Sequence, residues 1–298
     1  MQFGVALPNF SRLGTRQALV EVAREAEDLG YASVWVTDHV MMAGGQEEPY
    51  GRILEAFVAL TWAAAVTERV QLGTSVLVLT QRQPVLVAKQ AATLDYLSDG
   101  RLILGVGAGW NAREFGFLGV DFERRGARLN ESIRALRELW TSPEPRFEGE
   151  FVRFSDVRFE PRPVQPGGPP IWLGGSSPAA LRRAARLCDG WQPVGASPEA
   201  VAAGLRTIRA TAGERSVVGS VRLRTAVGQT LPPHRGASGD PQATLSGSAE
   251  QVRQVVQAYA EAGVTHLLCA FAGGELREYL GQMEAFANQV AQPLASTR

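Results

Sequence analysis

Residues 102–115 read LILGVGAGWNAREF, an apolar run that breaks into glycines and then turns polar. The apolar part predicts a buried strand. Gly105, Gly107 and Gly109 follow at alternate positions. Because glycine weakens a strand interior, this repeat indicates a bend, or a place where another backbone or a ligand comes close. The polar residues from Trp110 to Glu114 come next. The stretch therefore predicts a strand whose C-terminal end borders a site.

Seven further strand-like segments, each followed by a helical pattern, lie on either side of this stretch. They are Gln2–Leu7, Ala32–Val36, Val70–Leu79, Ile171–Leu173, Trp191–Pro193, Val217–Val227 and Val264–Phe271. Alternating strands and helices imply a parallel sheet, and eight such units favour a closed (β/α)8 barrel over an open doubly wound sheet. We expect one α/β domain over residues 1–298, with insertions after strands 4 and 7. The second insertion, Gly228–Leu245, is interpreted as a candidate lid.

The composition argues against several classes of partner. Lys+Arg and Asp+Glu each number 30, so net charge gives no case for binding nucleic acid or an anionic membrane. No run approaches a membrane span, and Met1 leads directly into a strand-like segment rather than a signal peptide. Cys188 and Cys269 lie in separate apolar contexts, which fits a reducing compartment. We therefore expect a cytoplasmic protein.

Polar residues follow several of the predicted strands. In a barrel of this kind the active site forms at the C-terminal ends of the strands. That rule brings Asp38 and His39, after the second strand, to the same mouth as Ser75 in the third. His39 is accordingly interpreted as a site residue rather than as a satisfied core histidine. His234 and His266 have no spacing that would complete a metal site with it, so we expect no metal.

The turn Gly174-Gly175-Ser176-Ser177 follows the fifth strand and precedes a helix with proline at its first position. Two glycines let backbone N–H groups approach an anion, the serine hydroxyls add donors, and the helix N-terminus adds a positive dipole end. These features indicate a phosphate site. An ordinary turn with a serine cap is the alternative that the sequence leaves open.

Together these motifs resemble the luciferase-like monooxygenase superfamily, in particular its coenzyme F420-dependent oxidoreductases. The similar segments are Ala26–Tyr31, Ser33–His39, Leu72–Val76, Gly100–Asn111, Glu114–Phe115 and Pro170–Ser176. They occur in order and span most of the chain from Phe3 to Trp191. The set is specific for the superfamily and much less specific for the cofactor.

The resemblance implies a barrel that holds F420 or FMN at its C-terminal mouth. It implies a cis peptide bond between Ser75 and Val76 that supports the ring, and His39 as the acid or base. The implied cofactor contacts are Asp38, Ser75, Val76, Gly107, Asn111, Arg128, Gly174, Gly175, Ser176 and Ser177. Sugar-phosphate dehydrogenases of this family have a glutamate proton donor after the strand-four glycines, where this chain has Trp110. They also have a tryptophan after the Asp-His pair, where this chain has Met41 and Met42.

These observations lead to a hypothesis about function. We expect an F420-dependent oxidoreductase that moves a hydride between the deazaflavin and a small organic substrate, with His39 moving the accompanying proton. An FMN-dependent monooxygenase using reduced flavin and oxygen is the second hypothesis, and a flavin-binding protein without catalysis is the third. Barrels of this superfamily commonly pair, so we expect a homodimer through the helices that follow strands two and three.

Overall fold

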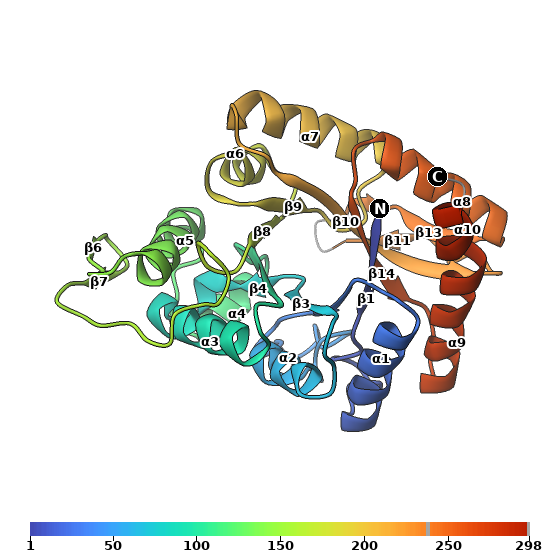
Figure 1. Ribbon diagram of the computed structural model, residues 1–298, viewed down its shortest axis with the longest axis horizontal. Coiled ribbons are helices and arrows are strands. Elements are labelled where there is room, and N and C mark those ends of the chain that lie inside the picture. Colours follow the sequence, from blue (N-terminus) through green and yellow to red (C-terminus); the bar gives the residue numbers. More distant parts are fainter. Residues whose placement is uncertain (237–238, 297–298) are drawn as a thin grey trace.

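Parallel strands close into a barrel in the computed structural model, which describes residues 1–236 and 239–296 (Figure 1). Around the barrel the strands are β1 (Gln2–Ala6), β2 (Ser33–Val36), β3 (Gln71–Thr74), β5 (Leu102–Gly107), β8 (Ile171–Gly174), β9 (Gly190–Gln192), β10 (Val218–Val227) and β14 (His266–Phe271). Each pairs in parallel with the next, and β14 pairs with β1 to close the ring. The predicted (β/α)8 barrel is confirmed.

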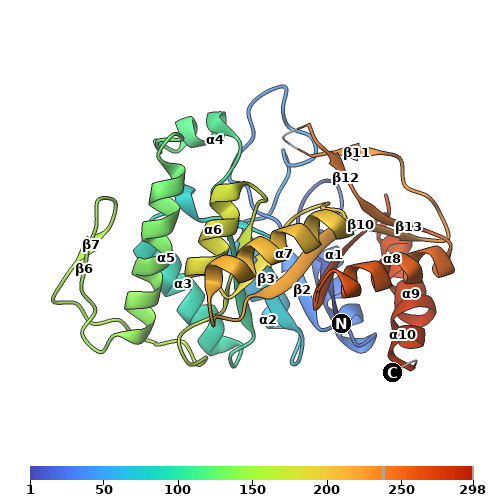
Figure 2. The same ribbon diagram turned by 90° about the horizontal axis from the view of Figure 1, so that it is seen from above.

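Helices form the outer layer (Figures 1 and 2). They are α1 (Arg16–Asp28), α2 (Ala56–Ala64), α3 (Pro84–Leu97), α5 (Arg125–Thr141), α6 (Pro178–Leu187), α7 (Pro198–Ala212), α8 (Ala249–Glu261), α9 (Leu276–Phe286) and α10 (Gln292–Ser296). The short helix α4 (Ala112–Phe117) lies apart from this layer, at the C-terminal end of β5 (Figure 2). A 3-10 turn, η1 (Leu79–Gln81), precedes α3, and a π-helical turn, η2 (Ala287–Ala291), joins α9 to α10. Over the described ranges, no helix combines the length and apolar character needed to cross a bilayer.

Side-chain caps begin several of the outer helices. Thr15 accepts a hydrogen bond from the Ala18 N–H at the start of α1. At the start of α8, Ser248 accepts from the Gln251 N–H while the Gln251 side chain accepts from the Ser248 N–H. Each cap satisfies backbone donors that the helix itself leaves unpaired. These caps determine the residue at which each helix begins. They therefore also determine where the preceding loop ends.

Both predicted insertions are present. The first, after β5, contains α4, α5 and a hairpin of β6 (Phe147–Glu148) and β7 (Arg153–Phe154), which projects beside α5 (Figure 2). The second contains β11 (His234–Arg235), β12 (Pro241–Gln242) and the first part of β13 (Thr244–Gly247). β13 pairs in parallel with the C-terminal half of β10 and extends the barrel rim. Ala237 and Ser238, within the candidate lid, lie outside the described residues.

Two indole rings fill the N-terminal half of the barrel lumen. Trp35 and Trp172 are both buried, and their ring centroids lie 5.2 Å apart. Glycines on neighbouring strands make room for them: a Cβ on Gly73 would lie 2.1 Å from Trp35, and one on Gly190 would lie 2.5 Å from Trp172. Interiors of this kind are packed cores. These rings close the N-terminal half of the lumen, so a site inside the barrel can lie only in the C-terminal half.

His266 packs edge-on against both indole rings and gives the fold a pH dependence. Burial lowers the pKa of His266 from 6.5 to about 4, so the ring is neutral in the native state at neutral pH. Between pH 6.5 and 4 the unfolded chain takes up a proton that the native protein does not. The free energy of unfolding should therefore fall as the pH falls through this window, by up to about 3 kcal/mol.

Urea unfolding at pH 7 and at pH 4.5 measures this effect in the wild type and in His266→Gln. The glutamine side chain retains polar atoms near Ser33, whose hydroxyl lies 2.7 Å from the imidazole Nε2. We expect a smaller difference between the two pH values in the variant. Equal differences in the two proteins would show that His266 does not carry the pH dependence.

Candidate active site

The third strand of the barrel breaks at the mouth. β3 ends at Thr74 and β4 (Leu77–Val78) resumes the pairing with β5. Between them lies a cis peptide bond joining Ser75 to Val76, which confirms the bond that the sequence implied. The Thr74 hydroxyl donates a hydrogen bond of 2.6 Å to the Gly105 carbonyl oxygen and ties the break to the next strand.

The glycines of β5 and β8 make room for this break. A Cβ on Gly105 would lie 1.9 Å from the Thr74 carbonyl oxygen, and one on Gly107 would lie 2.7 Å from Val76 Cγ2. On the other side, a Cβ on Gly174 would lie 3.0 Å from the same methyl group. The sequence left open a bend, a close backbone or a ligand as the reason for the glycine repeat. In the structure the nearest neighbours of Gly105 and Gly107 belong to the chain itself.

A buried histidine–glutamate pair lies at the C-terminal ends of β2 and β5. His39 Nδ1 is 2.9 Å from Glu114 Oε2, and the Val40 N–H donates 2.6 Å to Glu114 Oε1. Burial opposes ionisation of Glu114, but the hydrogen bonds from His39 and from the Val40 N–H hold its pKa below the usual range. An ionised carboxylate only accepts hydrogen bonds. The proton between the two groups therefore sits on His39 Nδ1, and in the neutral ring Nε2 keeps its lone pair.

Asn111 positions this glutamate. Its side-chain oxygen accepts from the Arg113 N–H at 3.2 Å and from the Glu114 N–H at 3.5 Å, and it thereby caps α4. Asn111 was predicted from the sequence as a cofactor contact. In the structure its oxygen serves the helix, and its Nδ2 lies 3.8 Å from Met42 Sδ. Sequence reasoning gave Glu114 no role, although its position three residues after Asn111 is the spacing of a capped first turn.

Two aromatic rings cover His39. The Tyr50 ring is tilted by 35° to the imidazole with centroids 4.6 Å apart, and Trp110 meets it edge-on at 5.6 Å. His39 is only 6% exposed, whereas Trp110 is 47% exposed. The pair is therefore shielded from bulk water by residues that themselves face the solvent. Such shielding strengthens the electrostatic interaction between the imidazole and its carboxylate.

Asp38 points to a different partner. Its two carboxylate oxygens accept from Arg82 Nη1 and Nη2, each at 2.7 Å, and Oδ2 also accepts from the Val78 N–H at 2.8 Å. Burial raises the pKa of Asp38, and the guanidinium counteracts that shift. Arg128 in turn donates to the Thr80 carbonyl oxygen at 2.9 Å. Asp38 and Arg128 thus hold the segment from β4 through η1 in place in this structure, and their contacts with a cofactor stay predictions.

The turn after β8 has the features of an anion-binding loop. Gly175 has a φ of +95°, a conformation that side-chain-bearing residues rarely adopt, and its carbonyl oxygen accepts from Trp191 Nε1 at 2.8 Å. Ser177 caps α6 by accepting from the Ala180 N–H at 3.2 Å. Ser176 and Ser177 are exposed. The serine cap expected of an ordinary turn is therefore present. This cap leaves the N-terminus of α6 accessible from solvent.

An arginine that sequence reasoning missed crosses the lumen beneath the mouth. Arg222, on β10, donates from Nη1 to Thr37 Oγ1 at 2.8 Å and to the Ser75 carbonyl oxygen at 2.7 Å. The side chain is buried, and burial lowers its pKa. Its place in an alternating strand gave no sign of function, because the two acceptors lie far away in the sequence.

The structure thus assembles the predicted residues in separate groups. Val76 packs between Gly107 and Gly174, which joins the walls of β3, β5 and β8. The pair of His39 with Glu114 joins the ends of β2 and β5. No hydrogen bond among the described residues links the serines of the Gly174–Ser177 turn to either group.

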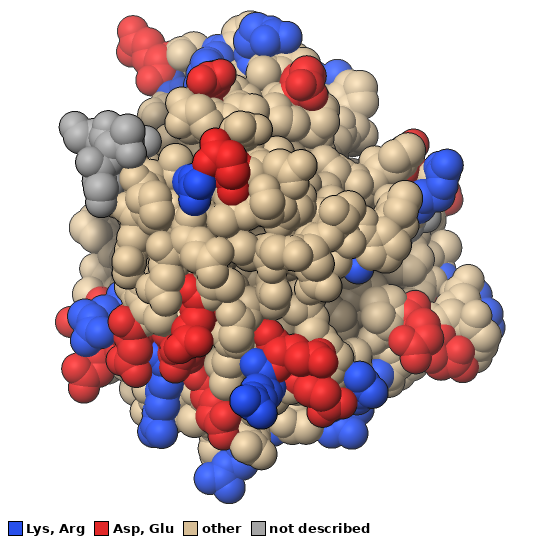
Figure 3. All heavy atoms as spheres, turned by 90° about the vertical axis from the view of Figure 1, so that its right-hand side faces the viewer, with Lys and Arg blue, Asp and Glu red and all other residues tan. Residues whose placement is uncertain are grey.

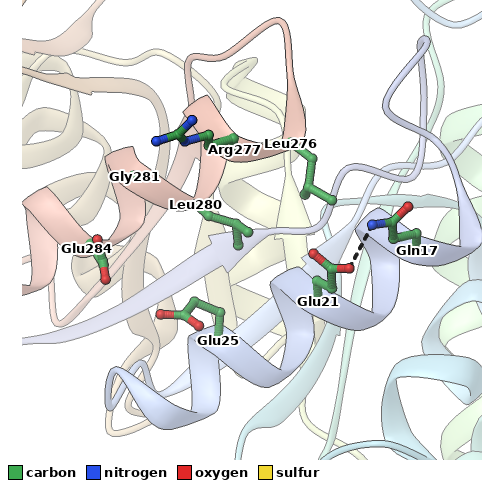
Figure 4. Close-up of a pocket in the computed structure, with 8 residues that line it drawn as sticks. All are labelled: Gln17, Glu21, Glu25, Leu276, Arg277, Leu280, Gly281 and Glu284. Carbon is green, nitrogen blue, oxygen red and sulfur yellow. Dashed lines mark hydrogen bonds between the residues drawn. The ribbon is translucent and has the colours of Figure 1, made fainter.

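A surface groove lies away from the mouth, between α1 and α9 (Figure 4). It has a volume of about 540 Å³ and is lined by Gln17, Glu21, Glu25, Leu276, Arg277, Leu280, Gly281 and Glu284. None of the predicted site residues lines it. Figure 3 shows the face that carries α8 to α10, where charged side chains gather in the lower part and the middle is mostly uncharged. The groove belongs to the outer helices and contributes nothing to the mouth.

Comparison with known proteins places the chain in a family. A family model described as luciferase-like monooxygenase matches residues 1–234. The F420-dependent glucose-6-phosphate dehydrogenase of Amycolatopsis mediterranei is 41% identical over 182 residues, which cover 58% of this chain and 52% of that protein. An uncharacterised protein of Mycobacterium tuberculosis is 36% identical over 204 residues, covering 64% of this chain and 71% of that protein. The chain therefore matches only about half the length of the named dehydrogenase.

Solved structures show the same fold at low sequence identity. A monooxygenase from Streptomyces bottropensis is similar with a TM-score of 0.82 and 22% identity, covering 99% of this chain and 100% of that one. The coenzyme F420-dependent tetrahydromethanopterin reductase of Methanopyrus kandleri has a TM-score of 0.78 and 18% identity, with 98% of each chain covered. These likenesses show the shared fold, and the family model that matches residues 1–234 shows that the chain belongs to the luciferase-like monooxygenase family.

Proposed function

We propose that this chain is an F420-dependent oxidoreductase that transfers a hydride between the deazaflavin and a small organic substrate. The observation that carries the proposal is the His39–Glu114 pair, an oriented proton donor or acceptor at the mouth of a luciferase-like barrel. The 41% identical relative is described as F420-dependent, which supports the deazaflavin over FMN. The bound deazaflavin would supply the hydride chemistry, and the protein would supply position and proton.

The residues at the mouth fit a flat ring with a phosphate-bearing tail. Ser75 Oγ is buried and makes no hydrogen bond within the described part of the chain, so it is free to pair with a polar ring edge. Val76, between two glycines, would support the ring. The exposed turn Gly174–Ser177 would hold phosphate through backbone N–H groups and the α6 N-terminus. Asp38, Asn111 and Arg128 would act mainly by holding these segments in place.

His39 would move the proton that accompanies the hydride. Its Nδ1–H is fixed by the Glu114 carboxylate, so Nε2 is the atom that exchanges a proton with the substrate. Glu114 also stabilises the imidazolium that forms when Nε2 accepts a proton. The rings of Tyr50 and Trp110 exclude bulk water from the imidazole. These proposed roles are supported by the contacts of His39 with Glu114 and with the two aromatic rings.

Titration of the purified protein with oxidised and reduced F420, and separately with FMN, tests the cofactor assignment. We expect saturable binding of F420 and much weaker binding of FMN. Micromolar binding of FMN with no binding of F420 would contradict the proposal and favour a flavin monooxygenase, which oxygen uptake with reduced FMN would then identify. F420 binding without turnover of any substrate would support the non-catalytic alternative.

The oligomeric state is a separate expectation. We propose a homodimer through α2 and α3, which lie side by side (Figure 1) and carry exposed apolar side chains. Val58 and Leu97 are each 68% exposed and Trp62 is 46% exposed. Apolar clusters of this kind are typical of interfaces.

Light scattering coupled to size-exclusion chromatography tests this prediction by measuring the molar mass of the protein in solution. We expect a dimer for the wild type and a shift toward monomer for Val58→Glu, because a charge would be buried at the interface. Ala203→Glu is the matched control, since Ala203 is exposed on α7, which packs beside α6 and α8 rather than α2 and α3. A monomeric wild type, or an equal shift in the control, would contradict the proposed interface.

A further inference from the structure

Two arginines lie on one face of β10. Arg222 and Arg224 are two residues apart, so both side chains point to the same side of the strand. Arg222 reaches across the lumen to Thr37 and to Ser75, and that side is therefore the interior of the barrel. Arg224 lies one step nearer the C-terminal end of β10, and is half-buried. The pair places two positive charges in the open half of the lumen.

Neither charge has a carboxylate partner among the described residues. The side chain of Arg222 is 9% exposed, and its two hydrogen bonds go to neutral acceptors. The groups close enough to interact electrostatically are the hydroxyls of Tyr50 and Tyr279. A buried cation without a counterion is unfavourable, and burial accordingly lowers the pKa of Arg222. An anion that enters the lumen would relieve this cost.

Further polar atoms near the arginines also lack partners. Gln192 Oε1, on the adjacent strand β9, is buried without a hydrogen bond, and Gln192 Nε2 reaches only Ser220 Oγ at 3.4 Å. Ser75 Oγ is likewise unpaired, while the carbonyl oxygen of Ser75 accepts from Arg222. Buried polar atoms in native structures nearly always have partners, so unpaired ones point to a ligand. A carboxylate accepts hydrogen bonds from a guanidinium, which matches Arg222.

The position of the arginines identifies the occupant. The cofactor contacts proposed above come from β3, β5 and β8, whereas Arg222 and Arg224 come from β10. Arg222 reaches the Ser75 carbonyl oxygen, so an anion that it binds would lie beside the proposed ring site. Tyr50 packs against His39 and also lies within electrostatic reach of Arg222. An anion bound by the arginines would therefore lie near the atom that His39 protonates.

We propose that Arg222, assisted by Arg224, binds a carboxylate of the substrate. The identification of the anion as part of the substrate rests on the proposed function, while the anion site itself rests on the geometry of β10. The substrate class is then a small organic acid whose reacting carbon lies close to its carboxylate. Arg222 would fix the orientation of that carbon toward His39.

Calorimetric titration of the cofactor-free protein with sodium acetate and sodium benzoate tests the site, with chloride keeping the ionic strength constant. We expect saturable binding by the wild type and affinity weakened at least about tenfold in Arg222→Gln, the loss typical of one charge-assisted hydrogen bond. Arg224→Gln should also bind more weakly. The matched control is Arg206→Gln, because Arg206 is exposed on the outer helix α7, and it should bind as the wild type does.

Circular dichroism shows whether Arg222→Gln folds, and if it does not, Arg222→Lys and Arg224→Gln take its place in the titration. Failure of both carboxylates to bind the wild type, or unchanged affinity in every folded β10 variant, would overturn the proposal. Titration with reduced and oxidised F420 distinguishes the two possible sources of the anion, which are the carboxylate of the substrate and the ring of the reduced cofactor. If the β10 variants weaken only the reduced cofactor and leave carboxylate binding unchanged, the anion belongs to the ring and the proposal is wrong. Absence of F420 binding beside intact acetate binding would overturn the proposed function and leave the anion site standing.

Discussion

Replacing His39 with asparagine is expected to lower turnover by about 10²- to 10⁴-fold, the usual contribution of a positioned acid or base. The asparagine amide can still donate a hydrogen bond toward Glu114 Oε2, so the carboxylate is not left without a partner. What the variant lacks is the second nitrogen, Nε2, which exchanges the proton. The decay or growth of deazaflavin absorbance, followed with a substrate that the wild type reduces or oxidises, gives the rate.

Cofactor titration in the same variant separates chemistry from binding. We expect the affinity of His39→Asn for F420 to stay within a few-fold of the wild type, because the proposed contacts lie on other strands. Glu114→Gln serves as the companion variant: it keeps the shape of the side chain and removes the charge that fixes the Nδ1 proton. It should retain part of the turnover and shift its pH profile. Unchanged turnover in His39→Asn would rule out the proton role.

Gly105→Ala is expected to destabilise the protein by about 3 kcal/mol, at the upper end for overpacking a core. The added methyl carbon would lie 1.9 Å from the carbonyl oxygen of Thr74, a backbone atom that cannot rotate away. That oxygen belongs to a strand paired with β5, so relief requires the two strands to separate. Urea unfolding at neutral pH measures the loss.

Gly116→Ala is the matched control. Gly116 lies in α4, and a Cβ built there meets no atom within 4 Å. Alanine also favours a helix over glycine by roughly 1 kcal/mol, so this variant should be neutral or slightly more stable. If both alanine variants had the same stability as the wild type, the close approach of Thr74 would not constrain residue 105.

Much of the fold could be predicted because its signals are local. The cap of Thr15 on α1 and the capping box at Ser248 each depend on residues within one helical turn. The cis bond at Ser75 was implied by motifs whose order and spacing survive in the chain. Signals of this kind need no knowledge of what the segment packs against.

The partners within the site could not be predicted, because they are set by strand register across the barrel. Asp38 meets Arg82, which lies 44 residues away, and Arg222 meets Thr37 across a separation of 185 residues. Nothing in the residues around Arg222 distinguishes it from an arginine on an exposed strand face. The sequence likewise could not decide among a bend, a close backbone and a ligand at the β5 glycines, because it does not reveal that the break after Thr74 fills the space beside Gly105.

The indole rings of Trp35 and Trp172 close the barrel at its N-terminal end, so its opening is at the C-terminal end. The rings fill the lumen on the N-terminal side, and Trp35 Nε1 is itself bonded to Ser33 Oγ at 2.7 Å. Substrate, product and exchangeable protons that reach His39 or Arg222 must therefore pass through the same opening, at the C-terminal ends of the strands. A substrate cannot enter while a product is leaving. The loops around that opening, rather than the barrel wall, therefore determine the order of substrate binding and product release.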